Sequence, residues 1–341
     1  MVKSLKRVAA CATTAFLILL AQTIRAAPTN AAAHLFARRS VATAQERNRS
    51  HTPQRDAAER ASAGIRMPFT ARFRQSQGRG LLVKTWVNGA GPYTFAIDTG
   101  AGATILSTRV AQEARVGISV NRSMPVGGLN GANSGNSWQA KVRSLAIGDA
   151  QNFLPVRGYT IVADRLPSDI DGILDPTESY WPLGYTIDIP RGEISSFDPQ
   201  TNPLRSADTP VEGTVVPWIF EGSSRRPYVM LDNGRRALLD TGSNFGLALS
   251  ETVARSFGII TERGRDRGEV RDIVGTPINA RRVRATTVRV GALSLRGVPT
   301  DLLSGIERGA PILLGRAALE PFRLQFDPVN RLISIAPVRL R

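Results

Sequence analysis

The sequence contains an internal repeat, and this repeat constrains the fold more than any other feature. Residues 93–101 (YTFAIDTGA) correspond to residues 235–243 (RRALLDTGS), and both segments run from an apolar stretch into Asp-Thr-Gly. A repeat at a fixed spacing indicates that one structural unit occurs twice. We therefore expect two similar lobes, with an aspartate at the same place in each.

Further features recur in the same order in both copies. They are a helical segment (107–114 and 250–257), a glycine-containing turn (127–131 and 275–276), a strand end (144–148 and 288–291), an apolar run (172–175 and 312–315) and a strand pair around Asp188 and Asp327. The separation between the aspartate and the end of the apolar run is nearly the same in both copies. Two unrelated domains with similar turns would not explain why both copies place an aspartate at the end of an apolar strand.

The local pattern is typical of β-structure. From residue 79 onward, short runs rich in β-branched and aromatic residues alternate with Gly, Pro, Asn and Asp. The predicted strands include residues 81–87, 93–97, 156–162, 185–189, 285–290 and 332–335. The clearest helical patterns cover residues 107–114 and 250–257. The predicted class is all-β with minor helix.

The residue types available to the folded region exclude several kinds of chemistry. Cys11, His34 and His51 are the only cysteine and histidines, and all three precede the repeat. Without them the repeat cannot contain a disulfide, a thiolate nucleophile, a Ser-His-Asp triad or a His-rich zinc site. A Ser-Lys dyad could use only Lys84 or Lys141, and neither lies in a recognisable nucleophile motif. Acid–base chemistry must therefore depend mainly on carboxylates.

The N-terminal region predicts export. Residues 1–27 combine Lys3, Lys6 and Arg7 with an apolar run at 8–21, which is typical of a secretory signal peptide. Residues 28–78, rich in Arg and Ala, contain few large apolar residues and are expected to be a flexible linker or pro-segment. The two lobes are predicted at 79–205 and 206–341. We expect the mature protein in the periplasm or outside the cell.

The basic charge is concentrated in the same N-terminal region. Residues 1–79 contain 14 Lys or Arg and 3 Asp or Glu, whereas residues 80–341 contain 30 and 25. A basic tail attracts anionic surfaces without specificity, so weak contact with a membrane surface stays open as an alternative role for it. We expect no nucleic-acid partner for the folded part.

Asp98 and Asp240 are the candidate catalytic residues. If the repeats face each other about a twofold axis, the two carboxyl groups meet between the lobes. Two carboxylates at close range share one proton, so one can act as a base while the other acts as an acid. This chemistry needs no metal and no cofactor.

The residues after each aspartate are expected to support the loops. The hydroxyl groups of Thr99 and Thr241 can form hydrogen bonds with the opposite loop. Gly100 and Gly242 allow the backbone to bend and another group to approach closely. A single Asp-Thr-Gly would be weak as a motif, because Asp and Gly are common in turns.

The segment Phe95–Leu106 (FAIDTGAGATIL) resembles the active-site segment of retropepsin-like aspartic proteases, and Leu313–Arg316 (LLGR) resembles the stretch that supports their aspartate loops. The resemblance implies two β-barrel lobes with an active-site cleft between them, as in single-chain pepsin-like enzymes. It implies a monomeric endopeptidase whose substrate is a peptide or an unfolded protein. By position, Gly127, Gly128 and Leu129 would lie at the tip of a substrate-binding flap.

The chain also departs from that family. Asp175 stands where the supporting stretch has glycine, which predicts a change of packing or charge behind Asp98. The first loop continues with Ala101 and the second with Ser243, and the flap has no tyrosine at its tip. Trp138 could cover the cleft or belong to the core, and the core is the favoured interpretation. These departures leave an alternative, a catalytically weak or inactive peptide-binding protein that uses the same cleft.

Overall fold

The computed structural model describes residues 66–76, 78–123, 129, 136–155, 160–222, 224–271 and 277–338. The chain separates into two compact units, Met1–Ser50 and His51–Arg341, and every described residue belongs to the second. The predicted signal peptide and most of the predicted linker lie outside the described residues. None of the helices in these ranges is long and apolar enough to cross a membrane.

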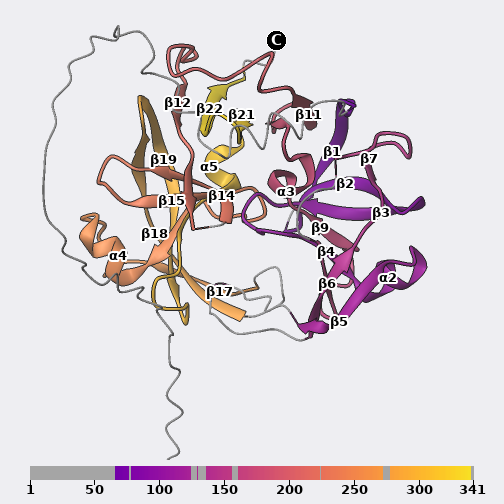
Figure 1. The fold of residues 1–341 in the computed structure, drawn as a ribbon. Helices are drawn as coiled ribbons and strands as arrows, with labels where there is room; N and C mark the ends of the chain where they lie inside the picture. The colour runs from indigo at the N-terminus through magenta and orange to yellow at the C-terminus, as the bar shows by residue number, and fades with distance from the viewer. Residues whose placement is uncertain are drawn as a thin grey trace, which may run out of the picture. The chain divides into compact units, whose positions relative to one another are not determined.

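The first copy of the repeat forms a lobe of short strands with short helices (Figure 1). Its elements are β1 (Ala71–Ser76), β2 (Gly80–Val87), β3 (Ala90–Ile97), β4 (Thr104–Ser107), α2 (Thr108–Glu113), β5 (Gly117–Ser123), β6 (Ser137–Lys141), β7 (Leu145–Ile147), β8 (Thr160–Ala163), β9 (Gly172–Leu174) and α3 (Pro176–Tyr180). The sequence predicted this lobe to begin at residue 79, but β1 begins at Ala71. The strand starts early because Ala71 and Phe73 are buried in the main core and β1 pairs with β2.

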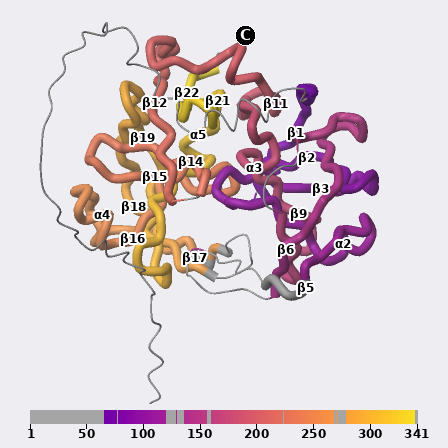
Figure 2. Tube along the Cα trace, in the orientation of Figure 1, coloured from indigo at the N-terminus to yellow at the C-terminus, as the bar shows by residue number. Residues whose placement is uncertain are grey.

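The second copy forms another lobe, and five further strands connect it with the first lobe. The connecting strands are β10 (Gly184–Asp188), β11 (Glu193–Phe197), β12 (Thr214–Pro217), β21 (Phe322–Asp327) and β22 (Leu332–Pro337). The second lobe contains β13 (Ile219–Glu221), β14 (Ser224–Met230), β15 (Arg236–Asp240), β16 (Leu247–Ser250), α4 (Glu251–Ser256), β17 (Arg265–Arg271), β18 (Pro277–Val290), β19 (Leu293–Ser304), β20 (Ile312–Gly315) and α5 (Arg316–Leu319). In Figure 2 these orange elements gather on one side and the indigo and magenta elements of the first lobe on the other.

The pairing of strands confirms the repeat and the all-β class. In the first lobe β3 runs parallel to β9, and in the second β15 runs parallel to β20. The strands that follow, β4 and β16, pair in parallel with β8 and β19. Each aspartate thus stands at the end of a strand flanked by the apolar run of its own lobe. Such strands are buried on both faces, which explains why they are continuously apolar.

A shared sheet holds the lobes together. Among the described residues, 14 strands form the larger sheet, in which β10 of the first copy pairs antiparallel with β21 of the second, and eight strands form the sheet of the second lobe. Tyr185 on β10 lies opposite Phe326 on β21, and their rings stack with centroids 4.6 Å apart. Trp218 packs edge-on against Phe326. The main apolar core is therefore continuous across the two lobes.

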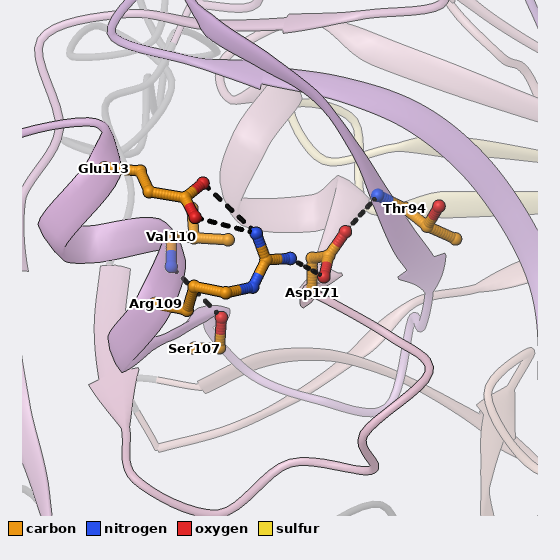
Figure 3. Close-up of polar contacts among 6 residues, drawn as sticks. All are labelled: Thr94, Ser107, Arg109, Val110, Glu113 and Asp171. Atoms are coloured by element: carbon orange, nitrogen blue, oxygen red, sulfur yellow. Dashed lines mark hydrogen bonds and ion pairs between the residues drawn. The ribbon is translucent and has the colours of Figure 1, made fainter.

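Asp171 ties the aspartate-bearing strand β3 to helix α2 (Figure 3). Its Oδ2 accepts a hydrogen bond of 2.8 Å from the backbone N–H of Thr94 on β3, and its other oxygen pairs with Arg109 on α2. Arg109 also pairs with Glu113, with Nη1 at 3.0 Å from Oε1. Backbone hydrogen bonds from Asp171 N to Thr94 O and from Ser107 N to Asp171 O complete the connection. The start of β9 is thereby held beside β3.

The two predicted helices form, and two more appear that the sequence did not predict. Ser107 and Ser250 cap α2 and α4, each accepting a hydrogen bond of 3.3 Å from a backbone N–H of the first turn. Serine at this position is favoured because its hydroxyl oxygen satisfies an N–H that has no partner within the helix. Helices α3 and α5 cover only Pro176–Tyr180 and Arg316–Leu319, too short to show a helical period in the sequence.

Asp301 on β19 is expected to stabilise the second lobe. Its side chain is fully buried, and it binds Arg282 on β18 at 2.7 and 2.9 Å and Arg267 on β17 at 3.1 Å. The arginines remain 34% and 30% exposed, so water can partly solvate them when the carboxylate is removed. We therefore expect Asp301→Asn to lower the free energy of unfolding by roughly 2–3 kcal/mol, less than the loss of a wholly buried ion pair. Urea denaturation measures this.

Glu221→Gln is the matched control for that measurement. Glu221 pairs with Arg236 at 3.1 Å, but both side chains are about half exposed. Its loss should cost less than about 1 kcal/mol. Equal effects of the two substitutions would contradict a structural role for Asp301.

Candidate active site

Asp98 and Asp240 lie at equivalent positions of the two lobes. Asp98 directly follows β3, and Asp240 is the last residue of β15. The backbone N–H of Asp98 donates to the carbonyl of Leu174 on β9 at 2.9 Å, and Asp240 lies opposite Gly315 in the β15–β20 pairing. The apolar run of each lobe thus supports its own aspartate loop, as the repeat predicted.

The two threonines join the loops through reciprocal hydrogen bonds. Thr99 Oγ1 donates to the carbonyl of Leu239 at 2.6 Å, and Thr241 Oγ1 donates to the carbonyl of Ile97 at 3.3 Å. Each Oγ1 also accepts from the backbone N–H of the other threonine, at 3.1 and 3.2 Å. Both threonines are completely buried. The predicted contact between each hydroxyl and the opposite loop is confirmed.

The glycines leave room for the carboxyl group of the opposite lobe. A Cβ atom at Gly242 would lie 2.5 Å from Asp98 Oδ2, and one at Gly100 would lie 2.9 Å from Asp240 Cγ. Both distances are shorter than any normal contact. Each carboxyl group therefore lies against the glycine of the opposite loop, and the two groups are close enough to interact electrostatically.

Backbone amides orient each carboxyl group. The N–H of Gly100 donates to Asp98 Oδ1 at 2.7 Å, and the N–H of Ser243 donates to Asp240 Oδ1 at 3.0 Å. One oxygen of each aspartate is thus held by its own loop. The geometry brings together the Asp, Thr and Gly residues of both loops that the sequence singled out.

The surroundings make the two carboxyl groups electrostatically unequal. Burial raises the pKa of Asp98 well above its usual range, and the charge of Asp240 raises it further. Burial also raises the pKa of Asp240, but hydrogen bonds from Ser243 N and from the Asp98 carboxyl group oppose that rise. The surroundings therefore favour a single proton shared by the pair, with Asp98 as its preferred site.

Comparison with known families supports this description of the two halves. A family described as gag-polyprotein putative aspartyl protease matches residues 83–160, and a family described as aspartyl protease matches residues 230–318. Each half of the chain thus contains a segment that matches an aspartyl protease family, and the two matches support a protease function. No individual curated protein matches the chain.

Asp175, the departure from the family pattern, caps helix α3. Its Oδ1 accepts hydrogen bonds from Thr177 N at 2.8 Å and Glu178 N at 3.3 Å, and the residue is 1% exposed. Burial, with the nearby charge of Glu178, raises the pKa of Asp175 to about 7. The charge of Asp175 in turn raises the pKa of Asp98. The carboxyl group of Asp175 thus lies within electrostatic reach of Asp98, as a side chain at this position predicts.

The second lobe keeps glycine at the equivalent place. Gly315 precedes α5 without any side-chain cap, and a Cβ atom there would lie 2.5 Å from the carbonyl oxygen of Phe245. The next residue, Arg316, is 6% exposed and donates from Nη1 to the carbonyl of Thr241 at 3.2 Å. Burial lowers the pKa of its guanidinium. The two lobes therefore support their aspartate loops in different ways.

The predicted flap is described at one residue only. Gly127 and Gly128 lie outside the described residues. Leu129 packs against an apolar cluster of the second lobe that includes Tyr228 and Phe245, and its carbonyl accepts a hydrogen bond of 2.9 Å from Glu307 N. A residue of the first copy thus contacts the second lobe. Trp138 packs against the main core, which was the favoured interpretation.

Sequence reasoning missed Arg226. This residue of β14 donates from Nη2 to the carbonyl of Ala101 at 3.2 Å, next to the first Asp-Thr-Gly loop. No motif marks it, because it lies on the strand before the one that carries Asp240 and far from the first loop in the sequence. Only the contact between the lobes reveals it.

The raised pKa of Asp175 predicts a pH-dependent stability. Its pKa is about 3.8 in the unfolded chain and about 7 in the folded one. Ionisation between these values favours the unfolded state, so the native protein loses stability as the pH rises through this window. Asp175→Asn keeps a capping oxygen but cannot ionise, and should therefore raise the melting temperature at pH values above about 7 and not below about pH 4.

Asp175→Gly separates the two properties. Glycine also removes the charge, but it leaves Thr177 N and Glu178 N without the side-chain acceptor. The Gly variant should be less stable than the Asn variant at every pH by roughly a few tenths of a kcal/mol. Thermal melts of the three proteins across the pH range measure both effects. A constant difference between wild type and Asp175→Asn would contradict the raised pKa.

Proposed function

We propose that this chain is an aspartic endopeptidase, which hydrolyses peptide bonds with a water molecule activated by Asp98 and Asp240. The observation that carries the proposal is the placement of the two carboxyl groups, one from each lobe, against the glycine of the opposite loop. The amide hydrogen bonds to each carboxyl group and the unequal pKa values give the pair an acid and a base in fixed orientation. The family match supports the same chemistry.

The mechanism uses the single proton of the pair. The Asp240 carboxylate takes a proton from water while the water oxygen attacks the amide carbon, and Asp98 donates its proton to the carbonyl oxygen. The intermediate is a neutral diol. Asp240 then gives its proton to the leaving nitrogen, the C–N bond breaks, and a diol hydroxyl returns a proton to Asp98. The products are a carboxylic acid and an amine, and the pair regains its starting state.

An extended peptide or an unfolded protein segment is the proposed substrate. Ala96 and Leu238, which precede the two aspartates on β3 and β15, belong to small apolar clusters in their respective lobes. Leu129 packs against the second of these clusters, in keeping with a flap that covers the substrate.

Substitution of either aspartate tests the proposal. Asp98→Asn and Asp240→Asn should each reduce cleavage by roughly 10²–10⁴-fold, because neither variant retains both an acid and a base. Digestion of a denatured protein mixture between about pH 3 and pH 8 measures cleavage and its pH range. Because the pKa of Asp98 is raised, the active single-proton state should persist above the pH at which a free aspartate ionises.

Asp208→Asn is the control, since Asp208 is exposed and lies in the connection before β12. It should cleave as the wild type does. Undiminished cleavage by either dyad variant would contradict the mechanism. Binding of peptides without any cleavage by the wild type would favour the alternative of a peptide-binding protein.

A methyl group at Gly242 should disturb the pair without removing either carboxyl group. In Gly242→Ala the new Cβ overlaps the Asp98 carboxyl group, so the two carboxyl groups must separate. We expect a loss of cleavage comparable to that of the Asn variants. Gly117→Ala is the control, because a Cβ there meets no atom within 4 Å. Full activity of Gly242→Ala would show that close contact of the carboxyl groups is not required.

A further inference from the structure

Arg226 extends from the second lobe onto the active-site loop of the first. Its Nη2 donates to the carbonyl of Ala101, which directly follows Asp98-Thr99-Gly100. A Cβ at Gly102 would lie only 2.8 Å from Arg226 Nε. Because residue 102 is a glycine, the guanidinium can lie close over this segment. The cation is partly buried between the lobes.

The charge of Arg226 acts on the dyad. It lowers the pKa of Asp240 and that of Asp175, so it stands within electrostatic reach of both. The charge of Arg226 also opposes the rise in the pKa of Tyr228, a member of the apolar cluster that Leu129 contacts. A substrate bound at the dyad would therefore pass close to this cation.

Three other arginines of the second lobe have carboxylate partners in direct contact. The neighbouring Arg225 binds both oxygens of Glu178, at 2.7 and 3.1 Å, and lies 4.4 Å from the centre of the Trp181 ring. Arg267 and Arg282 share Asp301. Within the described ranges, no carboxylate forms a direct ion pair with Arg226. A partly buried cation without a contacting counterion is costly, so the site favours an anion from outside the chain.

We propose that Arg226 binds a carboxylate of the substrate, an Asp or Glu side chain close to the scissile bond. This inference rests on the proposed endopeptidase function and assigns it a substrate class. A guanidinium has five N–H donors in a planar fork, and the hydrogen bond from Nη2 to Ala101 leaves others for a carboxylate. Hydrogen bonds between such charged groups are stronger than neutral ones and depend on direction.

Paired peptides that differ only in Glu or Gln test the proposal. Each position around the scissile bond is varied in turn, and kcat/KM is measured with the full-length protein. The wild type should prefer Glu by roughly ten- to a hundredfold at one position. In Arg226→Gln, which can still donate to Ala101, the Glu/Gln ratio at that position should fall to about one. Arg226→Glu should reverse the preference in favour of Lys.

The ratio isolates carboxylate recognition from the effect of Arg226 on the dyad, because a change in the pKa of Asp240 alters both peptides equally. Arg289→Ala, which removes an exposed arginine of β18, should keep the wild-type ratio. No Glu preference in the wild type, or a preference that survives in Arg226→Gln, would overturn the proposal.

A binding experiment keeps this result independent of catalysis. The affinities of the same Glu and Gln peptides are measured for Asp98→Asn and for Asp98→Asn combined with Arg226→Gln. Tighter binding of Glu that disappears in the double variant supports the role of Arg226 even if no peptide is cleaved. Absence of cleavage by the wild type would contradict only the endopeptidase function, whereas equal binding of Glu and Gln would contradict only the role of Arg226.

Discussion

The hydrogen bonds between Thr99 and Thr241 are the constraint on which the rest of the site depends. Each hydroxyl donates to the carbonyl directly before the opposite aspartate, at Leu239 and Ile97, and accepts from the opposite threonine amide. Each buried bond contributes about 1 kcal/mol, but losing one partner leaves a buried polar group unsatisfied at a greater cost. Since the acceptors adjoin the aspartates, these bonds set the distance between the two carboxyl groups.

Two kinds of contact join the lobes: the pairing of the connecting strands and the hydrogen bonds between the two threonines. Strand β10 of the first copy pairs with β21 of the second in the larger sheet, and Tyr185 stacks on Phe326 there. The stacked rings hold the two lobes together. The hydrogen bonds between the two loops align the aspartates with each other. Both contacts bring protein around the two carboxyl groups, and burial is the first cause of their raised pKa values.

The lobes repeat in topology but differ at the residues that surround the dyad. Asp175 caps α3 and raises the pKa of Asp98, whereas its counterpart Gly315 has no side chain and leads into the buried Arg316. Arg226 of the second lobe lowers the pKa of Asp240. A negative group behind one aspartate and a positive group beside the other both favour the proton on Asp98. In a symmetric pair, neither carboxyl group would be favoured as the site of the proton.

The repeat, the all-β class and the places of the two aspartates can be read from the order of residues alone. Short apolar runs that end in turn residues or in Asp-Thr-Gly are visible without any knowledge of the folded contacts. The sequence also removed the competing chemistries, since no Cys or His follows His51. The early start of β1, the short helix α5 and the position of Arg226 were decided by tertiary structure. Each depends on contacts between residues far apart in the chain, as does the pKa difference between Asp98 and Asp240, which arises from burial and from charges that only the folded lobes bring together.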